Sequence, residues 1–239
     1  MLLCDLGAEV IKIEPPGQGD PARRNFPFMD GISSYFLSIN RGQKSITLNL
    51  RDERAKKVVF ELVKMVDILV ENFRPGVMER LGFSYEEVRK HNPGIIYASI
   101  SGFGQKGPYK SKPAFDMIAQ GMGGTVSITG EPGRPPVRAG FSIGDIGAAL
   151  FAALAILAGL HEREKSGQGQ WIDVAMMDSQ VALCENACVR YFATGEIPQP
   201  LGSRHPLMTP FQIFPTKDGY IVLITCLLYT SPSPRDRTR

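Results

Sequence analysis

The sequence predicts an α/β fold with an open, mostly parallel sheet flanked by helices. Segments with strand character alternate with segments of helical character along the chain. Strands separated by helices of about ten or more residues are typical of βαβ units and a parallel sheet. Several of the strand segments are apolar runs without clean polar–apolar alternation, and this pattern is expected when helices cover both faces of a sheet.

The predicted strands are short runs rich in Ile, Val and Leu, bounded by turn-forming residues. In chain order they cover 9–14, 45–50, 67–73, 94–101, 170–176 and 220–224. The residues before the first strand, MLLCDLGA, are interpreted as the last turns of a helix that stops at Gly7. The main loops are predicted at 16–20 and 129–140, where glycine and proline are frequent.

The predicted helices connect these strands and cover 52–65, 84–91, 114–123, 145–163 and 177–193. The fourth contains IGAALFAALAILAGL, which is almost entirely apolar, so we expect it to be buried. The apolar run around residues 146 to 160 is short for a membrane span and rich in Ala and Gly. We therefore expect no membrane association.

The composition indicates a globular protein, with 43% apolar and 21% charged residues in 239. The formal net charge is only +3 and the basic residues are scattered, so we do not expect nucleic-acid binding. Four cysteines in a chain of this length do not form a disulfide framework, and we read Cys184 and Cys188 as small buried residues. Three histidines far apart in sequence predict no metal site. A reduced, cytoplasmic setting is the expectation.

One carboxylate stands out because it lies between a glycine and the apolar helix. Asp145 follows Gly144, and its first interpretation is a helix cap that accepts backbone N–H groups. The second is a nucleophile, since a helix N-terminus favours the ionised form and its N–H groups could stabilise an oxyanion. Gly144 and Gly147 would let a substrate approach the backbone closely. The two roles are compatible.

Two further segments matter because open α/β sheets bind ligands at the carboxyl ends of their strands. Segment 71–83 carries Asn72, Phe73, Arg74 and Arg80. Segment 101–116 contains GFGQKG, which fits GxGxxG by letter but precedes PYKSKP, a loop rather than a helix. Arginine and lysine here could hold phosphates one at a time, although solvated surface charge is the alternative.

Six segments in order resemble the class III CoA-transferase family, which includes formyl-CoA transferase and carnitine-type CoA-transferases. They are DLGAEVIKIEPPGQGDPAR, SINRGQKSITLNL, DILVENFRPGVMERLGF, IIYASISGFGQKGPY, AFDMIAQGMGG and HEREKSGQGQWIDVAMMDS. The resemblance implies that 1–224 is part of a Rossmann-like large domain, running toward the family's small domain and clipped at both ends. The tail 225–239 is expected to be non-native or disordered, because it has no period and repeats Ser-Pro.

The resemblance implies that Asp145 is the nucleophile of a CoA transfer. Its carboxylate would attack an acyl-CoA thioester, and an acyl-aspartyl anhydride and an enzyme–CoA thioester would follow before CoA reaches the acceptor acid. No metal and no tightly bound cofactor are expected, and coenzyme A enters as part of the substrate. The implied partners are an acyl-CoA, a small carboxylic acid and a second copy of the chain in an interlocked homodimer.

The resemblance also implies CoA contacts, carried over position by position. They are Leu48, Asn49, Arg51, Asn72, Phe73, Arg74, Arg80, Lys112 and Phe115. The resemblance also implies that three further residues are neighbours of the active site: Asp116, Gly144 and Gly147. The chain departs from the family at Pro15, where several members have a CoA-contacting arginine.

Two other functions stay open. The 2-methylacyl-CoA racemases resemble this chain but carry a histidine immediately before the acid of FDMIAQ, where this chain has Phe115. A phenyl ring cannot carry a proton, which favours the transferase. The other alternative is an inactive, CoA-binding fragment. The donor and acceptor acids also stay open: Arg190, Arg204 and His205 could pair with a dicarboxylic acid or could be surface charges.

Overall fold

The centre of the molecule is a three-stranded parallel sheet. The computed structural model describes residues 1–224, and the predicted tail lies outside them. The strands are β5 (Ile68–Glu71), β6 (Ile96–Ser101) and β7 (Gln170–Ala175), hydrogen-bonded in the order β5-β6-β7. Ser99 pairs with Glu71 on one side and Asp173 on the other, so all three strands end at the same edge. The predicted α/β class is confirmed.

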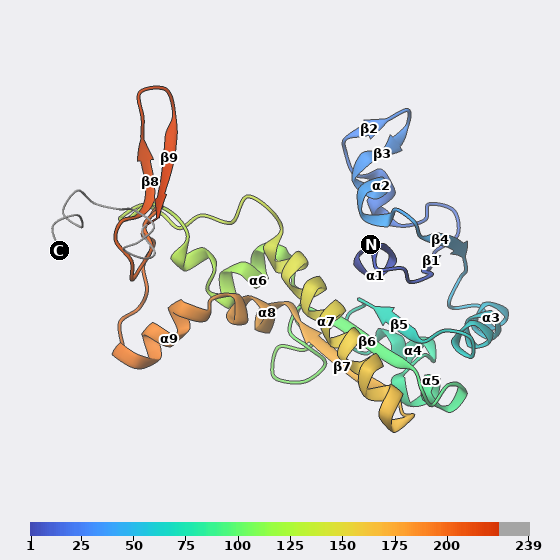
Figure 1. Cartoon of the computed structure of the whole chain (residues 1–239). Helices are drawn as coiled ribbons and strands as arrows, with labels where there is room; N and C mark the ends of the chain where they lie inside the picture. The colour runs from blue at the N-terminus through green and yellow to red at the C-terminus, as the bar shows by residue number, and fades with distance from the viewer. Residues whose placement is uncertain (225–239) are drawn as a thin grey trace, which may run out of the picture.

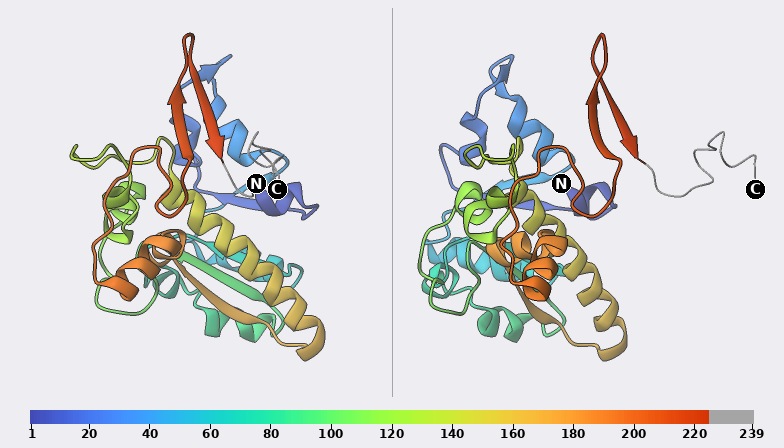
Figure 2. Two further views of the ribbon diagram at one scale, coloured as in Figure 1. Left: turned by 60° about the vertical axis from the view of Figure 1, so that its left-hand side comes forward. Right: turned by 90° about the vertical axis from the view of Figure 1, so that its left-hand side faces the viewer.

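Helix α7 (Ile143–Ser166) covers one face of this sheet (Figures 1 and 2). Near the start of β6, Ile96 packs against Ile156 in the second half of the helix. Near the strand end, Ile100 contacts the cluster that contains Ala148 and Ala152. Because the helix runs opposite to the strands, its amino end lies over the carboxyl edge of the sheet, where α/β folds place their ligands.

Three helices cover the opposite face. Their apolar side chains form one core cluster with Ile95 and Tyr97 of the β6 segment. Tyr97 is buried, and its hydroxyl donates to the carbonyl oxygen of Phe83 at 2.8 Å, so the phenol that faces the helices is satisfied. These helices are α3 (Glu53–Val63), α4 (Val77–Leu81) and α5 (Tyr85–His91).

The N-terminal strands form a separate parallel pair. Strands β1 (Ile11–Glu14) and β4 (Lys44–Thr47) pair with each other and with no strand of the central sheet. Ile13 and Leu48 pack against the cluster under α3 to α5, which attaches the pair to the core. The expectation of one continuous sheet is thereby corrected: the parallel strands form two separate sheets, β1-β4 and β5-β6-β7. The other elements of this region are α1 (Leu2–Asp5), η1 (Pro21–Arg24), β2 (Phe28–Met29), β3 (Ile32–Ser33) and α2 (Ser34–Asn40).

The predicted helix 177–193 is wrong as a single element. The chain turns at the buried Cys184, whose N–H donates to the carbonyls of Gln180 and Val181, so two helices form. The strand predicted at 220–224 pairs with an unpredicted partner in an antiparallel hairpin, which projects from the rest of the molecule (Figure 2). The elements outside the sheet are α6 (Asp116–Gly123), η2 (Val126–Ile128), α8 (Met176–Leu183), α9 (Glu185–Thr194), β8 (Phe211–Pro215) and β9 (Tyr220–Ile224).

Helix α7 is longer than the sequence predicts. It runs for 24 residues, and within 1–224 it is the one helix long and apolar enough to span a membrane by length and composition. One side of α7, with Ala148, Ala152 and Ile156, packs on β6 and β7. The other side is not buried, because Ile146, Leu150 and Leu154 are exposed, so the expectation that the whole apolar helix is buried is wrong.

Candidate active site

Asp145 lies in the first turn of α7 and is not its cap. The helix begins at Ile143, with Ser142 at the cap position and no capping hydrogen bond from that side chain. The prediction of Asp145 as a cap is therefore wrong. The physical reason lies on another helix: the N–H of Gly144 donates to Oδ1 of Asp116 at 2.8 Å, so α6 supplies a carboxylate to the amino end of α7.

Asp116 is tied on both carboxylate oxygens. Its Oδ2 accepts from Nε2 of Gln120 at 2.8 Å, one helical turn along α6. A Cβ on Gly144 would lie 2.8 Å from the Asp116 carbonyl oxygen and 2.9 Å from Oδ1. Only glycine permits this approach, and the groups that approach Gly144 are the backbone carbonyl and the carboxylate of Asp116.

Helix α8 packs against the same turn. Nε2 of the buried Gln180 donates to the carbonyl oxygen of Ile143 at 2.9 Å. A Cβ on Gly147 would lie 3.1 Å from that Nε2 and 2.9 Å from Cδ1 of Leu183. The close approach at Gly147 is thus also made by protein atoms, which fixes the helix against α8.

The carboxylate of Asp145 accepts no hydrogen bond from residues 1–224, and its residue is exposed. Desolvation by the surrounding protein, and then the negative charge of Asp116, raise the pKa of Asp145 above its ordinary value. Its charged form is less well stabilised than in water, which favours its use in a covalent bond. The turn therefore presents one unpaired carboxylate beside one that is fully hydrogen-bonded.

The cations predicted to contact CoA lie after strands, at the end of helix α4, or before α6. Arg51 follows β4, Arg74 follows β5, and Arg80 lies in the last turn of α4. Lys112 lies with its Nζ 4.1 Å from the ring centroid of Tyr109. All four are exposed, and within 1–224 none forms an ion pair. Unpaired guanidinium and ammonium groups of this kind can bind phosphate.

The other predicted contacts are divided between surface and core. Leu48 is half-buried and packs against the central cluster, and Oδ1 of Asn49 accepts from the N–H of Arg51 at 3.2 Å. Asn72 is exposed, and the N–H of Phe73 donates to Oε2 of Glu71 at 2.8 Å. The ring of Phe115, immediately before Asp116, is among the most exposed, as its residue is 76% accessible.

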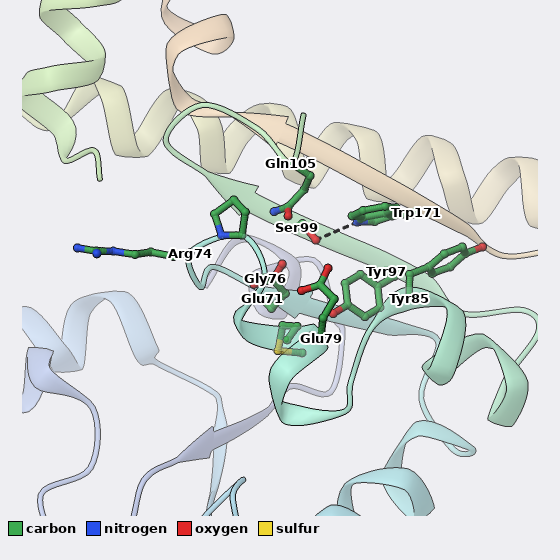
Figure 3. A pocket seen from close by; sticks show the side chains of 11 residues that line it. Glu71, Arg74, Gly76, Glu79, Tyr85, Tyr97, Ser99, Gln105 and Trp171 are labelled. Atoms are coloured by element: carbon green, nitrogen blue, oxygen red, sulfur yellow. Dashed lines mark hydrogen bonds between the residues drawn. The ribbon is translucent and has the colours of Figure 1, made fainter. Parts of the chain in front are cut away.

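A small hollow lies beside β5 and β6, on the face opposite α7 (Figure 3). Nε1 of Trp171 donates to Oγ of Ser99 at 2.9 Å. Burial, followed by the charges of Glu79 and Asp173, raises the pKa of the nearby Glu71. Arg74 extends away from the other labelled side chains (Figure 3). An acid-lined hollow disfavours phosphate, so this site does not suit a CoA phosphate. The only feature of the sequence that could have pointed to this hollow is Trp171, the single tryptophan of the chain.

His205 has a local role in the structure. Its Nδ1 accepts the N–H groups of Leu207 and Met208, each at 3.1 Å, and its ring stacks on Phe211 with centroids 4.7 Å apart. These contacts shape the loop before β8. Arg204 is exposed and Arg190 is half-buried on α9.

The family comparison matches nearly the whole chain. Residues 1–228 match the model of CoA-transferase family III. Acetyl-CoA:oxalate CoA-transferase of Acetobacter aceti is 48% identical over 93% of this chain and 57% of its own length. Succinyl-CoA:glutarate CoA-transferase of Mus musculus is 43% identical over 93% of the chain and 51% of its own length. The chain thus spans a little over half the length of these relatives.

Solved structures agree with the sequence match. A CaiB/BaiF family protein from Brucella suis superposes with a TM-score of 0.86 at 40% sequence identity. The match covers 92% of this chain and 59% of that one. Because the family model, the relatives and the fold agree over the same residues, the chain belongs to CoA-transferase family III.

Proposed function

We propose that the protein containing this chain transfers CoA from an acyl-CoA to a carboxylic acid, with Asp145 as the nucleophile. One observation carries the proposal. Of two neighbouring carboxylates, Asp116 is hydrogen-bonded on both oxygens, whereas Asp145 is exposed and accepts no hydrogen bond from residues 1–224. A covalent role needs the second kind of carboxylate, fixed by its backbone and free at its oxygens.

The proposed reaction exchanges activated acyl groups at one carboxylate. Asp145 adds to the thioester carbonyl and expels CoA thiolate, which forms an acyl-aspartyl anhydride. The thiolate then attacks the aspartyl carbonyl and releases the donor acid, which leaves a CoA thioester on Asp145. The acceptor carboxylate attacks this thioester, and the released thiolate attacks the acceptor carbonyl of the second anhydride. Asp145 is thereby restored, and every step exchanges one acyl bond for another.

The amino end of α7 supports this role through the helix dipole. Asp145 lies at the positive end of a 24-residue helix, which favours negative charge there. Three N–H groups of this end are already used: Ile143 donates to Phe141, Gly144 to Asp116 and Ile146 to Ser142. The proposal therefore assigns stabilisation of the oxyanion to donors other than these three.

A short dicarboxylic acid is the proposed acceptor class. The names of relatives include oxalate, mesaconate and glutarate as acids and succinyl-CoA as a donor. Arg190 and Arg204 are candidate partners for the second carboxylate. For the nucleotide part of CoA, four exposed cations that form no ion pair within 1–224 support phosphate binding; they are Arg51, Arg74, Arg80 and Lys112.

Phe115 separates this proposal from the racemase alternative. Proton transfer at the α-carbon needs a second base, and a phenyl ring at this position cannot supply one. The interlocked homodimer expected from the resemblance remains part of the proposal. The chain spans a little over half the length of its relatives. If catalysis requires the part of the relatives that this chain does not match, the chain alone would be an inactive, CoA-binding fragment.

Covalent trapping tests the proposal. The whole protein that contains this chain is incubated with succinyl-CoA, quenched with hydroxylamine and digested, and peptide masses are compared with those of an Asp145→Ala variant. We expect a CoA thioester or a hydroxamate on Asp145 that the variant lacks. A folded, CoA-binding protein that forms no adduct but exchanges the α-proton of a 2-methylacyl-CoA with solvent would support the racemase instead.

A further inference from the structure

The first turn of α7 is held from two sides by buried carboxamides. We infer that Gln120 and Gln180 are positioning residues, which orient this turn so that Asp145 faces its substrate. The inference rests on the proposed role of Asp145 and adds two residues to which the proposed chemistry assigns nothing. Both side chains are 0% exposed, and neither hydrogen-bonds to Asp145 itself.

Gln120 acts through Asp116. Its Nε2 donates to Oδ2 of Asp116 at 2.8 Å, while Oε1 accepts the N–H of Ala139 at 3.1 Å. These opposite requirements fix the orientation of the amide, because the nitrogen can only donate and the oxygen can only accept. The other oxygen of Asp116 holds the N–H of Gly144 at 2.8 Å. Gln120 therefore ties together α6, the segment before α7 and the residue before Asp145.

Gln180 holds the same turn from α8. Its Nε2 donates to the carbonyl oxygen of Ile143 at 2.9 Å, and its Oε1 accepts from Oγ1 of Thr125 at 3.2 Å. The Thr125 hydroxyl also lies 3.0 Å from the carbonyl oxygen of Gln120. The two glutamines thus belong to one network around two consecutive residues, Ile143 and Gly144.

Such a network matters more for orientation than for affinity. A helix end without a side-chain cap is free to fray or shift, and Ser142 provides no capping hydrogen bond here. A displacement of about 1 Å at a reacting group can lower a rate about 100-fold. CoA recognition, by contrast, is proposed for cations on other elements. Loss of a glutamine should therefore lower kcat and leave KM for the acyl-CoA nearly unchanged.

The test uses Gln120→Met and Gln180→Met in the whole protein, since methionine keeps a similar length and removes the amide. The matched control is Ser179→Ala on α8. Ser179 is buried and its Oγ donates to the carbonyl oxygen of Ala175 at 2.8 Å, but it makes no hydrogen bond to α7. We expect each methionine variant to lower kcat about 10- to 100-fold, with KM within about twofold of wild type. The control should keep its kcat within about twofold.

Gly147→Ala is a second route to the same displacement. Alanine favours a helix over glycine, yet its Cβ would lie 3.1 Å from Nε2 of Gln180. The variant should lower kcat in the same way even though α7 itself gains helix propensity. This variant keeps the inference testable if a methionine variant fails to fold.

Amide hydrogen exchange separates this inference from the proposed chemistry. The Gly144 N–H should exchange at least about tenfold faster in Gln120→Met than in wild type, while Ser179→Ala leaves it unchanged. If wild-type protein forms no adduct on Asp145 but this exchange result is obtained, the nucleophile proposal fails and the positioning stands. The positioning inference would be overturned if the methionine variants kept the wild-type kcat and the wild-type exchange rate. It would also be overturned if their kcat were no lower than that of Ser179→Ala.

Discussion

Gly144→Ala should destabilise the protein because the position has no room for a methyl group. An ideal Cβ would lie 2.8 Å from the carbonyl oxygen of Asp116 and 2.9 Å from its Oδ1. Overpacking of this kind costs about 1–3 kcal/mol. Displacement of Asp116 would also weaken the 2.8 Å hydrogen bond from the Gly144 N–H, and a bond to a charged group contributes about 1.5–3 kcal/mol. Higher helix propensity returns at most about 1 kcal/mol.

The net expectation is a loss of about 2–4 kcal/mol in the free energy of unfolding. Urea denaturation followed by circular dichroism measures it, and with an m-value of about 2 kcal/mol per M the midpoint should fall by about 1–2 M. Gly121→Ala is the control, because Gly121 lies in α6 and its Cβ would meet nothing within 4 Å. That substitution should leave the midpoint unchanged or raise it. Equal midpoints for both alanine variants would refute the steric argument.

Three further predictions concern charge. Asp116→Asn removes a negative charge that raises the pKa of Asp145. The acidic limb of the pH–rate profile should therefore move to lower pH. An unmoved limb would contradict an electrostatic effect of Asp116 on Asp145. Asp145→Asn should abolish adduct formation and also stabilise the fold at pH 7, because a raised folded-state pKa means that stability is lost as pH rises through it. The gain measured in urea should vanish at a pH where the carboxyl group is protonated, and a pH-independent gain would point to another cause. Arg80→Ala should weaken CoA binding in calorimetry about 10- to 100-fold if it holds a phosphate, whereas Arg54→Ala, already paired with Asp52, should not.

Much of the fold could be predicted from local pattern. The strands of the central sheet and the helices α3, α5 and α7 lie within a few residues of their predicted ranges. The short helices α2 and α4 were not predicted, because stretches of seven and five residues show too little of the 3.6-residue period. The break at Cys184 was missed for a different reason. The apolar pattern continues through it, and a turn without glycine or proline gives no local signal.

The candidate site was predicted only in part. The Gly144–Asp145 pair ahead of an apolar helix is visible in the sequence, and so are the cations that follow the strands. The resemblance named Asp116 as a neighbour of the active site, but its hydrogen bond to Gly144 and the contacts of the two glutamines were not predicted. Asp145 as a cap was a reasonable expectation from residue type, but the hydrogen bond that replaces a cap comes from a carboxylate on α6. A buried glutamine in a helix carries no sequence signal that distinguishes it from a surface glutamine.

By itself the sequence determined the α/β class, the order of the main elements, the family and the residue proposed as nucleophile. Only the tertiary structure decided how that residue is held. Gly144 meets Asp116 across 28 residues, and Ile143 meets Gln180 across 37. Periodicity reports which side of a helix is apolar, whereas these contacts depend on how α6, α7 and α8 pack together over the edge of the sheet. The β1–β4 pair, which the sequence joined to the central three-stranded sheet, is separate from it for the same reason, since backbone pairing is set by packing between distant segments.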